Sequence, residues 1–374
     1  MKRSNKPMLL KRKNKMNVSF RDKELALNAS KKIKELAGDK KFKFMHVCGT
    51  HEDTITRYGI RSLLPEGIEV ISGPGCPVCV TTAKEIDEAH ALADSAIITT
   101  FGDLLKVPGS RGKSLRDVKA GGKDVRVVYS ISDAVKIAKS TDKEVVHIGI
   151  GFETTAPSTA AVLNDDLPEN FSVLSCHRII PPAMDALLSP GEIKIDGFID
   201  PGHVSTIIGV KAYEPLSEKY GVPQVIAGFE PLDVLFGIVM LLEMIENEDF
   251  SVRNEYSRVV RYEGNLKAQR LLGEIFDICD VAWRGFPVIP KSGLELKKEF
   301  SDFNARKKFD IKIEKSIDIP EGCRCGDVLK GLIYPDECKL FCRACNPEHP
   351  VGACMVSNEG SCAIWHRYGG KFKF

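Results

Sequence analysis

Seven of the twelve cysteines of this 374-residue chain lie within residues 323–374. The chain from Pro320 onward is also rich in glycine and proline and shows little hydrophobic periodicity. Such a segment cannot bury much apolar surface, so it usually needs a bound metal or crosslinks to hold one conformation. The seven are Cys323, Cys325, Cys338, Cys342, Cys345, Cys354 and Cys362. They predict a C-terminal region that is built around sulfur.

The spacing of these cysteines favours an iron–sulfur cluster over zinc. A zinc ribbon would show two C-x2-C pairs, whereas only Cys342 and Cys345 are spaced in this way. The irregular spacing of the others suits a larger cubane cluster held by thiolates. Zinc and unligated thiols are the alternatives. Because four thiolates complete a [4Fe–4S] site, the surplus thiols could cycle between dithiol and disulfide.

The rest of the composition limits the location and the partners of the protein. A net charge of +2 gives no reason to expect nucleic acid as a partner. No run approaches the roughly 18 to 20 apolar residues that span a membrane, and the longest, near Val234–Met244, predicts a buried helix. Residues 1–20 form a basic segment without the apolar core of a signal peptide. We therefore expect a flexible basic tail on a cytoplasmic protein, whose thiols stay reduced.

Residues 21–250 repeat one theme, in which a short apolar run leads into a polar or glycine-rich loop and then into a helical pattern. This alternation predicts parallel sheets in an α/β architecture. The apolar runs are residues 42–47, 68–71, 95–99, 125–129, 144–150, 197–199 and 224–227. We expect two similar α/β lobes, at residues 21–130 and 131–250, followed by a helical and Cys-rich iron–sulfur domain at 251–374.

A second pair of cysteines lies in the turn "GPGCPVC" at residues 73–79. The C-x2-C spacing of Cys76 and Cys79 lowers the pKa of one thiol and allows a reversible disulfide. The turn precedes a predicted helix at 82–93, whose N-terminal N–H groups favour a thiolate. The pair could also supply half of a metal site, or simply fill the turn.

The segment "CGTHE" at residues 48–52 follows a predicted strand. Cys48 and His51 could ligate one metal ion, with Glu52 orienting the imidazole. They could equally act as a nucleophile and its base, or form a turn whose histidine is hydrogen-bonded.

Three weaker candidates also follow apolar runs, at the strand ends where ligands bind in open α/β sheets. They are Glu153 in "GFETT", His203 in "PGHVS" and Glu230 in "GFEP". A glutamate at a helix start can instead complement the helix dipole. No glycine-rich dinucleotide fingerprint or P-loop is present in the sequence, so neither function is supported.

Together these motifs resemble the HypD family of [NiFe]-hydrogenase maturation proteins. The resemblance runs in order from about residue 40 to the end and rests on "CGTHE", "GPGCPVC", "GFETT", "PGHVS", "AGFEP" and "ACMVSNEGSCA". It implies two α/β lobes and a [4Fe–4S] cluster. It also implies a HypC-type chaperone as partner, with which one iron is held while it gains two cyanides and a carbon monoxide. A HypE-type carrier would deliver the cyanide as a thiocyanate.

The resemblance also implies roles for individual residues. Cys48 and His51 would lie at the iron-assembly site, and Cys76 and Cys79 would be the redox-active dithiol. The implied cluster ligands are Cys323, Cys338, Cys345 and Cys362. Cys325 and Cys354 would form a second thiol pair, and Cys342 lies where the family pattern has a glycine.

This assignment is chemically consistent, because the release of cyanide from its carrier needs electrons. A cluster supplies electrons singly and a dithiol stores them in pairs. Iron with cyanide and carbonyl ligands is soft, which suits a thiolate. Two other functions fit the residues: a cluster-dependent thiol–disulfide reductase that needs no iron at Cys48, and a zinc-stabilised α/β binding module without redox chemistry.

Overall fold

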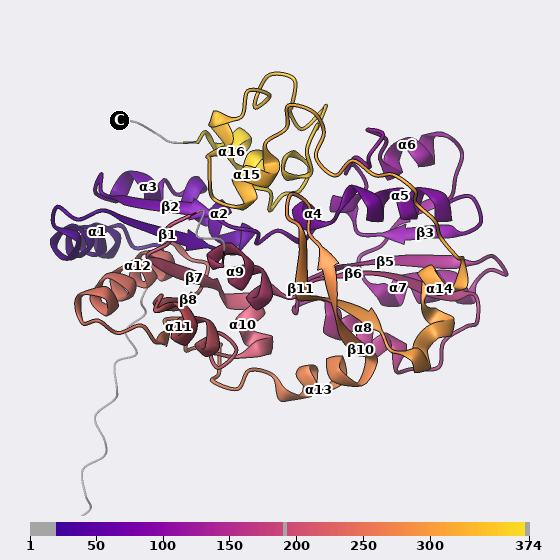
Figure 1. Ribbon diagram of the computed structural model, residues 1–374, viewed down its shortest axis with the longest axis horizontal. Coiled ribbons are helices and arrows are strands. Elements are labelled where there is room, and N and C mark those ends of the chain that lie inside the picture. The colour runs from indigo at the N-terminus through magenta and orange to yellow at the C-terminus, as the bar shows by residue number, and fades with distance from the viewer. Residues whose placement is uncertain (1–19, 190–192, 371–374) are drawn as a thin grey trace, which may run out of the picture.

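Two parallel β-sheets form the frame of the protein in a computed structural model that describes residues 20–189 and 193–370 (Figure 1). The first sheet has five strands in the order β2–β1–β7–β8–β9. Its strands are β1 Phe42–His46, β2 Ile68–Ser72, β7 Gly197–Pro201, β8 Gln224–Ala227 and β9 Val252–Asn254. All its pairings are parallel. This sheet forms the lobe on the left of Figure 1.

The second sheet has four parallel strands in the order β4–β3–β5–β6 and lies in the other lobe. Its strands are β3 Ile97–Thr100, β4 Val125–Val127, β5 Val145–Gly151 and β6 Phe171–His177. Every residue of β5 and of the edge strand β6 is buried, as expected for strands that are covered on both faces. The predicted α/β class with parallel sheets in two lobes is confirmed.

The two lobes are not consecutive in the chain, so the predicted ranges 21–130 and 131–250 do not match the sheets. The first of these ranges gives β1 and β2 to one sheet and β3 and β4 to the other. The chain then returns, and Phe44 of β1 pairs with Gly197 of β7. Hydrophobic alternation identifies strands but not their neighbours, which is why this interleaving escaped the sequence analysis.

Helices cover the sheets, and most begin directly after a strand. In the five-stranded lobe, α1 and α12 pack against each other and cover one face with an apolar core. The helix α12 is apolar on nearly all sides, as expected for the predicted buried helix. The helices of this part are α1 Lys23–Ala37, α2 Gly49–Arg57, α3 Ile60–Leu63, α9 Ile180–Leu188, α10 Gly202–Ile208, α11 Glu214–Tyr220 and α12 Pro231–Glu246. None of the helices in the described ranges combines the length and apolarity needed to cross a membrane.

The remaining helices belong to the second lobe and its surroundings. They are α4 Pro77–Val80, α5 Ala83–Leu92, α6 Leu115–Ala120, α7 Ile131–Lys139, α8 Ala156–Leu163, α13 Leu266–Ile275 and α14 Ala305–Lys308, with 3-10 turns η1 Gly102–Leu104 and η2 Lys298–Phe303. The predicted helix at 82–93 is α5. The helical part of the predicted domain 251–374 begins only at α13, because β9 and a series of turns occupy residues 252–265.

An antiparallel hairpin joins the two lobes and was not predicted. It consists of β10 Phe276–Ala282 and β11 Val288–Leu296. The strand β11 packs against both β6 and α9, which belong to different lobes. The predicted domain 251–374 is therefore wrong in its first part, because β9 and the hairpin are integral to the lobes.

The C-terminal region lies over the junction of the two lobes (yellow in Figure 1). It consists mainly of turns, with α15 Cys325–Leu329, η3 Pro335–Glu337, η4 Ala353–Met355 and α16 Ser361–Tyr368. The helix α16 packs on α2, and η4 packs on α4. The predicted basic tail at 1–20 lies outside the described residues except for Phe20.

Candidate functional site

The carboxyl edge of the five-stranded sheet contains the point where the strand order reverses. From β1 the chain proceeds to β2 on one side, and β7, β8 and β9 are added later on the other side. Ligands bind at such switch points in open α/β sheets. Cys48 follows β1 by two residues and is the N-cap residue of α2, and Asp200 and His203 lie at the end of the adjacent β7. The sheet thus brings the "CGTHE" and "PGHVS" motifs to one place.

Cys48 is partly exposed and is packed closely against the loop that carries the second cysteine pair. The N–H of Gly49 donates to the carbonyl of Gly75 at 3.1 Å, and any side chain at Gly75 would overlap the backbone of Cys48. Glycine at position 75 therefore allows the two motifs to touch. Burial raises the pKa of the Cys48 thiol to about 11, and nearby Glu359 acts in the same direction.

His51 is fully buried and presents one ring nitrogen without a partner in the described structure. Its Nε2 lies 2.9 Å from the carbonyl oxygen of Gly228. Because a carbonyl only accepts, Nε2 carries the proton, and Nδ1, which has no hydrogen-bond partner among the described residues, holds a free lone pair. Burial lowers the pKa of His51 to about 3, so the ring is neutral at physiological pH. A neutral imidazole with a free nitrogen is a competent metal ligand.

Two aromatic contacts join this histidine to the other predicted motifs. The ring of Phe229, from "AGFEP", lies 5.0 Å from that of His51 and 4.0 Å from that of His203. His203 is exposed. Phe229 therefore separates a buried imidazole from one that faces solvent. Glu230 instead caps α12 and forms an ion pair with Arg21 at 2.6 Å. The structure therefore does not bring Glu230 to the predicted site residues His51 and His203.

Glu52 does not orient His51 as we expected. Its carboxylate accepts from His46 at 2.7 Å, from Arg61 at 2.8 Å and from Trp365 of α16 at 2.6 Å. Burial opposes ionisation, but Arg61 and His46 outweigh it and hold the pKa of Glu52 well below its usual range. Because Trp365 belongs to the C-terminal region, this buried carboxylate fixes that region to α2. The partner was missed because the two residues are 313 positions apart.

The cysteines of the "GPGCPVC" turn form a disulfide, with 5.2 Å between their Cα atoms. Cys76 is the N-cap residue of the short helix α4, and its sulfur accepts from the N–H of Cys79 at 3.2 Å. Both residues are buried. The pair is therefore bonded in the structure, at the start of the short helix α4, which was not predicted, and the predicted helix α5 follows it.

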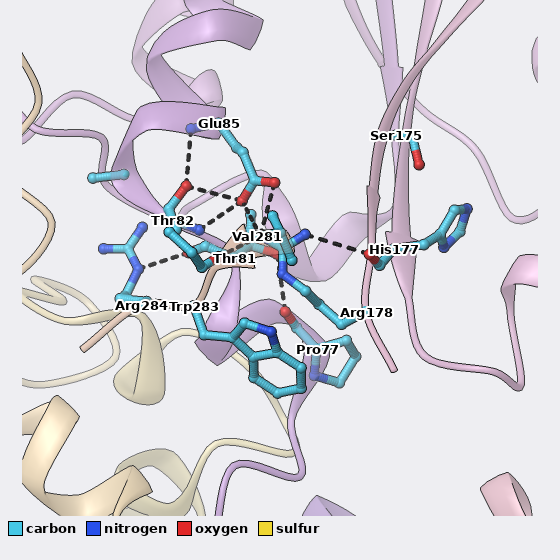
Figure 2. A network of polar contacts seen from close by, with 12 residues as sticks. Pro77, Thr81, Thr82, Glu85, Ser175, His177, Arg178, Val281, Trp283 and Arg284 are labelled. Carbon is cyan, nitrogen blue, oxygen red and sulfur yellow. Dashed lines mark hydrogen bonds and ion pairs between the residues drawn. The ribbon is translucent and has the colours of Figure 1, made fainter. Parts of the chain in front are cut away.

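Polar contacts fix the chain that follows Cys79 (Figure 2). The hydroxyl of Thr82 donates to Glu85 at 2.9 Å, and Arg178, which follows β6, donates to the same carboxylate at 2.7 Å. Arg284, from the hairpin, donates to the carbonyl of Thr81 at 2.7 Å. The chain that follows the Cys76–Cys79 turn is therefore held by a helix, a strand end and the interlobe hairpin together.

Six of the seven C-terminal cysteines surround a single cavity. Its apolar lining includes Val328, Leu340, Phe341 and Met355. The six are Cys323, Cys325, Cys338, Cys345, Cys354 and Cys362. The thiol of Cys325 interacts with those of Cys323 and Cys354. Cys342 is exposed and lies outside the cavity.

The chemistry of this cavity fits an iron–sulfur cluster. Within residues 20–189 and 193–370 no three His, Cys, Asp or Glu side chains are grouped so as to hold a single metal ion. Six soft thiols around an apolar space instead match the larger donor set of a cluster, whose ligands bind different irons. Because η4, which contains Cys354, packs on α4, which contains Cys79, the cavity also adjoins the Cys76–Cys79 turn.

Glu153 is buried and follows β5 by two residues. Its Oε1 accepts from the N–H of Ile180 at the start of α9, at 3.0 Å, and its Oε2 has no partner in the described structure. Burial raises the pKa of Glu153 to about 7. Burial also raises the pKa of Tyr213, and Asp200, Glu153 and Cys48 add to that rise, so all three lie near this phenol.

Three further residues of this region were not predicted from the sequence. Both carboxylate oxygens of Asp200 lack a partner among the described residues, and burial raises its pKa well above the usual range. Glu359 lies 3.5 Å from the hydroxyl of Thr50, next to Cys48. Arg284 donates to the carbonyl of Thr81, two residues after Cys79. Asp200 directly precedes "PGHVS" and Glu359 lies within "VSNEGSC", so their positions beside motifs were the available signal.

Comparisons with known proteins extend over nearly the whole chain. Residues 24–369 match the family model described as "HypD: Hydrogenase formation hypA family". The chain is 51% identical to a protein of Methanocaldococcus jannaschii that is named for hydrogenase expression and formation, over 94% of this chain and 99% of that protein. It is 46% identical to the hydrogenase maturation factor HypD2 of Bradyrhizobium diazoefficiens, over 94% and 96% of the two chains. It is 44% identical to the hydrogenase maturation factor HypD of Cupriavidus necator, over 95% and 97%.

Proposed function

Because the chain belongs to the HypD family of hydrogenase maturation proteins, as its motifs predicted, we propose that it is the scaffold on which an iron atom receives its cyanide and carbon monoxide ligands. The iron is cargo, held at the carboxyl edge of the five-stranded sheet. The proposal is carried by one observation: Cys48, the Cys76–Cys79 pair and the C-terminal thiols lie in one continuous series of contacts.

Cys48 and His51 are the proposed protein ligands of this iron. The sulfur of Cys48 is soft and partly exposed, and Nδ1 of His51 has a free lone pair. The described residues place no third side-chain ligand beside them. The other positions on the iron would be taken by the diatomic ligands and by a donor from a HypC-type chaperone. The exposed ring of His203 lies on the side from which such a partner would approach.

The Cys76–Cys79 pair is the proposed source of electrons for cyanide transfer. A HypE-type carrier would bring the cyanide as a thiocyanate, R–S–C≡N. Two thiols then give R–SH, cyanide and a disulfide, with release of one proton. The S–CN bond breaks, an S–S bond forms, and the iron takes the cyanide. Cys76 and Cys79 can form this disulfide without moving their backbone, because they are bonded in the structure.

Four of the six cavity cysteines, Cys323, Cys338, Cys345 and Cys362, would hold a [4Fe–4S] cluster. When bound, the cluster supplies single electrons, and two of these regenerate the dithiol. Cys325 and Cys354 are neighbours, and η4, which contains Cys354, packs on α4, so a second thiol pair there would pass electrons to the disulfide. The apolar lining of the cavity would limit access of water to the cluster.

The test is infrared spectroscopy of the protein, purified without oxygen together with its chaperone. We expect bands from iron-bound cyanide and carbonyl together with the brown colour of a cluster. Cys48→Ala should abolish the bands and leave the colour, because it removes a cargo ligand only. Cys342→Ala is the matched control, since this thiol is outside the cavity, and it should leave both signals intact. Bands that survive in Cys48→Ala would show that Cys48 does not hold the iron.

A thiol–disulfide reductase is the second candidate, and the bonded pair beside the Cys-rich cavity favours it. This function would need the cluster and the Cys76–Cys79 pair but no iron at Cys48. Electron transfer to a disulfide substrate that persists at the full rate in Cys48→Ala, in a protein without cyanide bands in its wild-type form, would support the reductase over the scaffold.

A further inference from the structure

The main chain at Cys48 receives a hydrogen bond that an ordinary helix start does not have. The carbonyl oxygen of Cys48 accepts from the N–H of Glu52 at 3.3 Å, which is the usual first bond of a helix such as α2. The same oxygen lies 3.0 Å from Nδ1 of His46 in β1. Because a carbonyl oxygen only accepts, Nδ1 carries a hydrogen and donates it. A buried side chain therefore holds the backbone from which the proposed iron ligand projects.

The other ring nitrogen of His46 is fixed in turn by Glu52. Nε2 lies 2.7 Å from the carboxylate of Glu52, to which Arg61 donates at 2.8 Å and which stays ionised. An ionised carboxylate only accepts, so Nε2 also donates. His46 and Glu52 are both fully buried. The imidazole thus has a partner on each nitrogen, and a turn of the ring would break both hydrogen bonds.

The C-terminal region contacts the same carboxylate. The helix α16 packs on α2 (Figure 1), and Nε1 of its buried Trp365 donates to Glu52 at 2.6 Å. The backbone of this region also touches the start of α2, since a side chain at Gly49 would come 2.5 Å from the carbonyl oxygen of Glu359. Three residues before Trp365, α16 carries Cys362, which lines the cysteine cavity. A continuous series of hydrogen bonds therefore runs from the helix of a cavity cysteine to the backbone at the start of α2.

We propose that His46 is a positioning residue for the thiol of Cys48, and that Trp365, acting through Glu52, makes this position depend on the docking of the C-terminal region. The inference rests on the proposed function, which makes Cys48 a ligand of the iron. His46 itself does not bind the iron, because both of its ring nitrogens are already used. Hydrogen-bonded residues behind a metal ligand fix its direction and thereby its affinity. The cargo position is therefore complete only when the C-terminal region is in place.

A purely structural role is the competing explanation, because the same hydrogen bonds also stabilise a buried contact. Two substitutions of His46 separate the two roles. Asparagine places an amide N–H where Nδ1 was, so His46→Asn keeps the donor to Cys48 and loses the donor to Glu52. Glutamine places the amide where Nε2 was, so His46→Gln keeps the donor to Glu52 and loses the donor to Cys48. Each variant removes the ring and one buried hydrogen bond, so a purely structural role predicts equal effects.

The two tryptophans of the chain supply a second matched pair. Both are buried and donate through the indole N–H, Trp365 to Glu52 at 2.6 Å and Trp283 to Ser292 at 2.9 Å. Trp365→Phe removes the donor that links the C-terminal region to Glu52. Trp283→Phe removes a comparable hydrogen bond in the interlobe hairpin and is the control.

The experiment measures how fast each cysteine of reduced, full-length protein reacts with iodoacetamide without oxygen, as read by mass spectrometry. The exposed Cys342 is the internal reference. His46→Gln should raise the relative rate of Cys48 about fivefold, the effect of one lost hydrogen bond on a local equilibrium, and His46→Asn should stay within about twofold of wild type. Trp365→Phe should raise this rate about threefold, because it acts through an intermediate residue, and Trp283→Phe should leave it unchanged.

A second measurement follows the iron itself. In protein purified with its chaperone, the infrared bands of iron-bound cyanide should shift or broaden in His46→Gln and in Trp365→Phe, and should stay as in wild type in His46→Asn and Trp283→Phe. Chemical denaturation of all four variants shows that they are folded.

The outcomes distinguish this inference from the proposed function. Equal rates of Cys48 in His46→Asn and His46→Gln, or equal rates in Trp365→Phe and Trp283→Phe, would overturn the positioning role. If neither variant of His46 folds, an unchanged rate in folded Trp365→Phe would overturn it as well. Normal cyanide bands in every variant together with equal rates of Cys48 contradict only this inference. Rates in the expected order, in a protein whose wild-type form never shows the bands, contradict only the proposed function.

Discussion

The sheet edge at Cys48 and the cysteine cavity of the C-terminal region are adjacent, yet they are constructed in opposite ways. At the sheet edge each candidate residue follows a strand, and regular hydrogen bonding places it. Around the cavity the described chain is mostly turns, with the short helix α15, the start of α16 and brief 3-10 segments. The edge is therefore preformed by the fold, whereas the cavity brings thiols together without a comparable framework.

This difference indicates how the two regions divide the proposed work. A preformed edge can bind and release cargo without losing its shape. A region with little secondary structure becomes rigid only when something binds its thiols, so its group is expected to be permanent. The contacts that couple the regions include the hydrogen bonds of Glu52 with Trp365 at 2.6 Å and of Ser72 with Ser361 at 2.7 Å.

The largest expected effect is loss of the bound group from the cavity. Cys338→Ala should bleach the brown colour and make the segment from Cys323 to Trp365 sensitive to protease, while the lobes stay folded. Structural metal sites in small domains contribute on the order of 10 kcal/mol to folding. Limited proteolysis with mass spectrometry checks this, with Cys342→Ala as the control. A protease-resistant C-terminal region in colourless Cys338→Ala would contradict the claim that this region, unlike the sheet edge, becomes rigid only when its thiols bind a group.

The next effect concerns the carboxylate that joins the two regions. Glu52→Gln should lower the free energy of unfolding by about 3 to 5 kcal/mol, because it leaves Arg61 without its buried partner. Chemical denaturation measures this. The control is Glu69→Gln at the exposed pair with Lys43, where about 1 kcal/mol or less is expected. Equal losses in the two variants would mean that the buried contact does not fasten the C-terminal region.

Glu153 gives a pH-dependent effect that is confined to the lobes. Its pKa is about 7 in the folded protein and about 4.5 when exposed, so the folded state binds more protons between these values. The contribution of Glu153 to the free energy of unfolding is therefore greatest below about pH 4.5 and is lost as the pH rises through 7. Glu153→Gln should match wild type at pH 4 and exceed it by about 3 kcal/mol at pH 8.

Denaturation curves at several pH values test this, with the exposed Glu66→Gln as the control. A stability difference between Glu153→Gln and wild type that does not change with pH would show that Glu153 is already ionised in the fold.

The smallest expected effect is that of the disulfide on stability. In oxidised protein, Cys76→Ser should lower the free energy of unfolding by about 2 kcal/mol, because the bond closes only a short loop. In protein kept reduced, the variant and wild type should unfold alike. Denaturation with and without a reductant distinguishes the two. A large loss under reducing conditions would give the Cys76 thiol a structural role that the redox proposal does not include.

Much of the sheet edge was predictable, because residues that follow an apolar run lie at the carboxyl ends of parallel strands. This rule located Cys48, His203 and the turn that contains Cys76 and Cys79. It could not choose the partner of Glu52, because both His46 and His51 are near in sequence and only the fold turns His51 toward Gly228. The clustering of Cys325 with Cys354 likewise depends on turns that carry no periodic signal.

The features that were missed share one physical cause, which is contact between segments far apart in the chain. β7 pairs with β1 across about 150 residues of sequence. Arg284 of the hairpin contacts Thr81, beside the Cys76–Cys79 turn, across about 200 residues. Local patterns of hydrophobicity contain no information about such pairings. Arg284 looked like an ordinary charged residue in a loop, and only its burial revealed it.

The interleaving of the sheets has a consequence for synthesis on the ribosome. All strands of the four-stranded sheet have been translated by residue 177, whereas the five-stranded sheet lacks its last strand until residue 254. Cys48 leaves the exit tunnel early but gains its neighbours from β7 and β8 only after the other lobe can already have formed. The nascent chain therefore exposes the thiol of Cys48 before its neighbours from β7 and β8 exist.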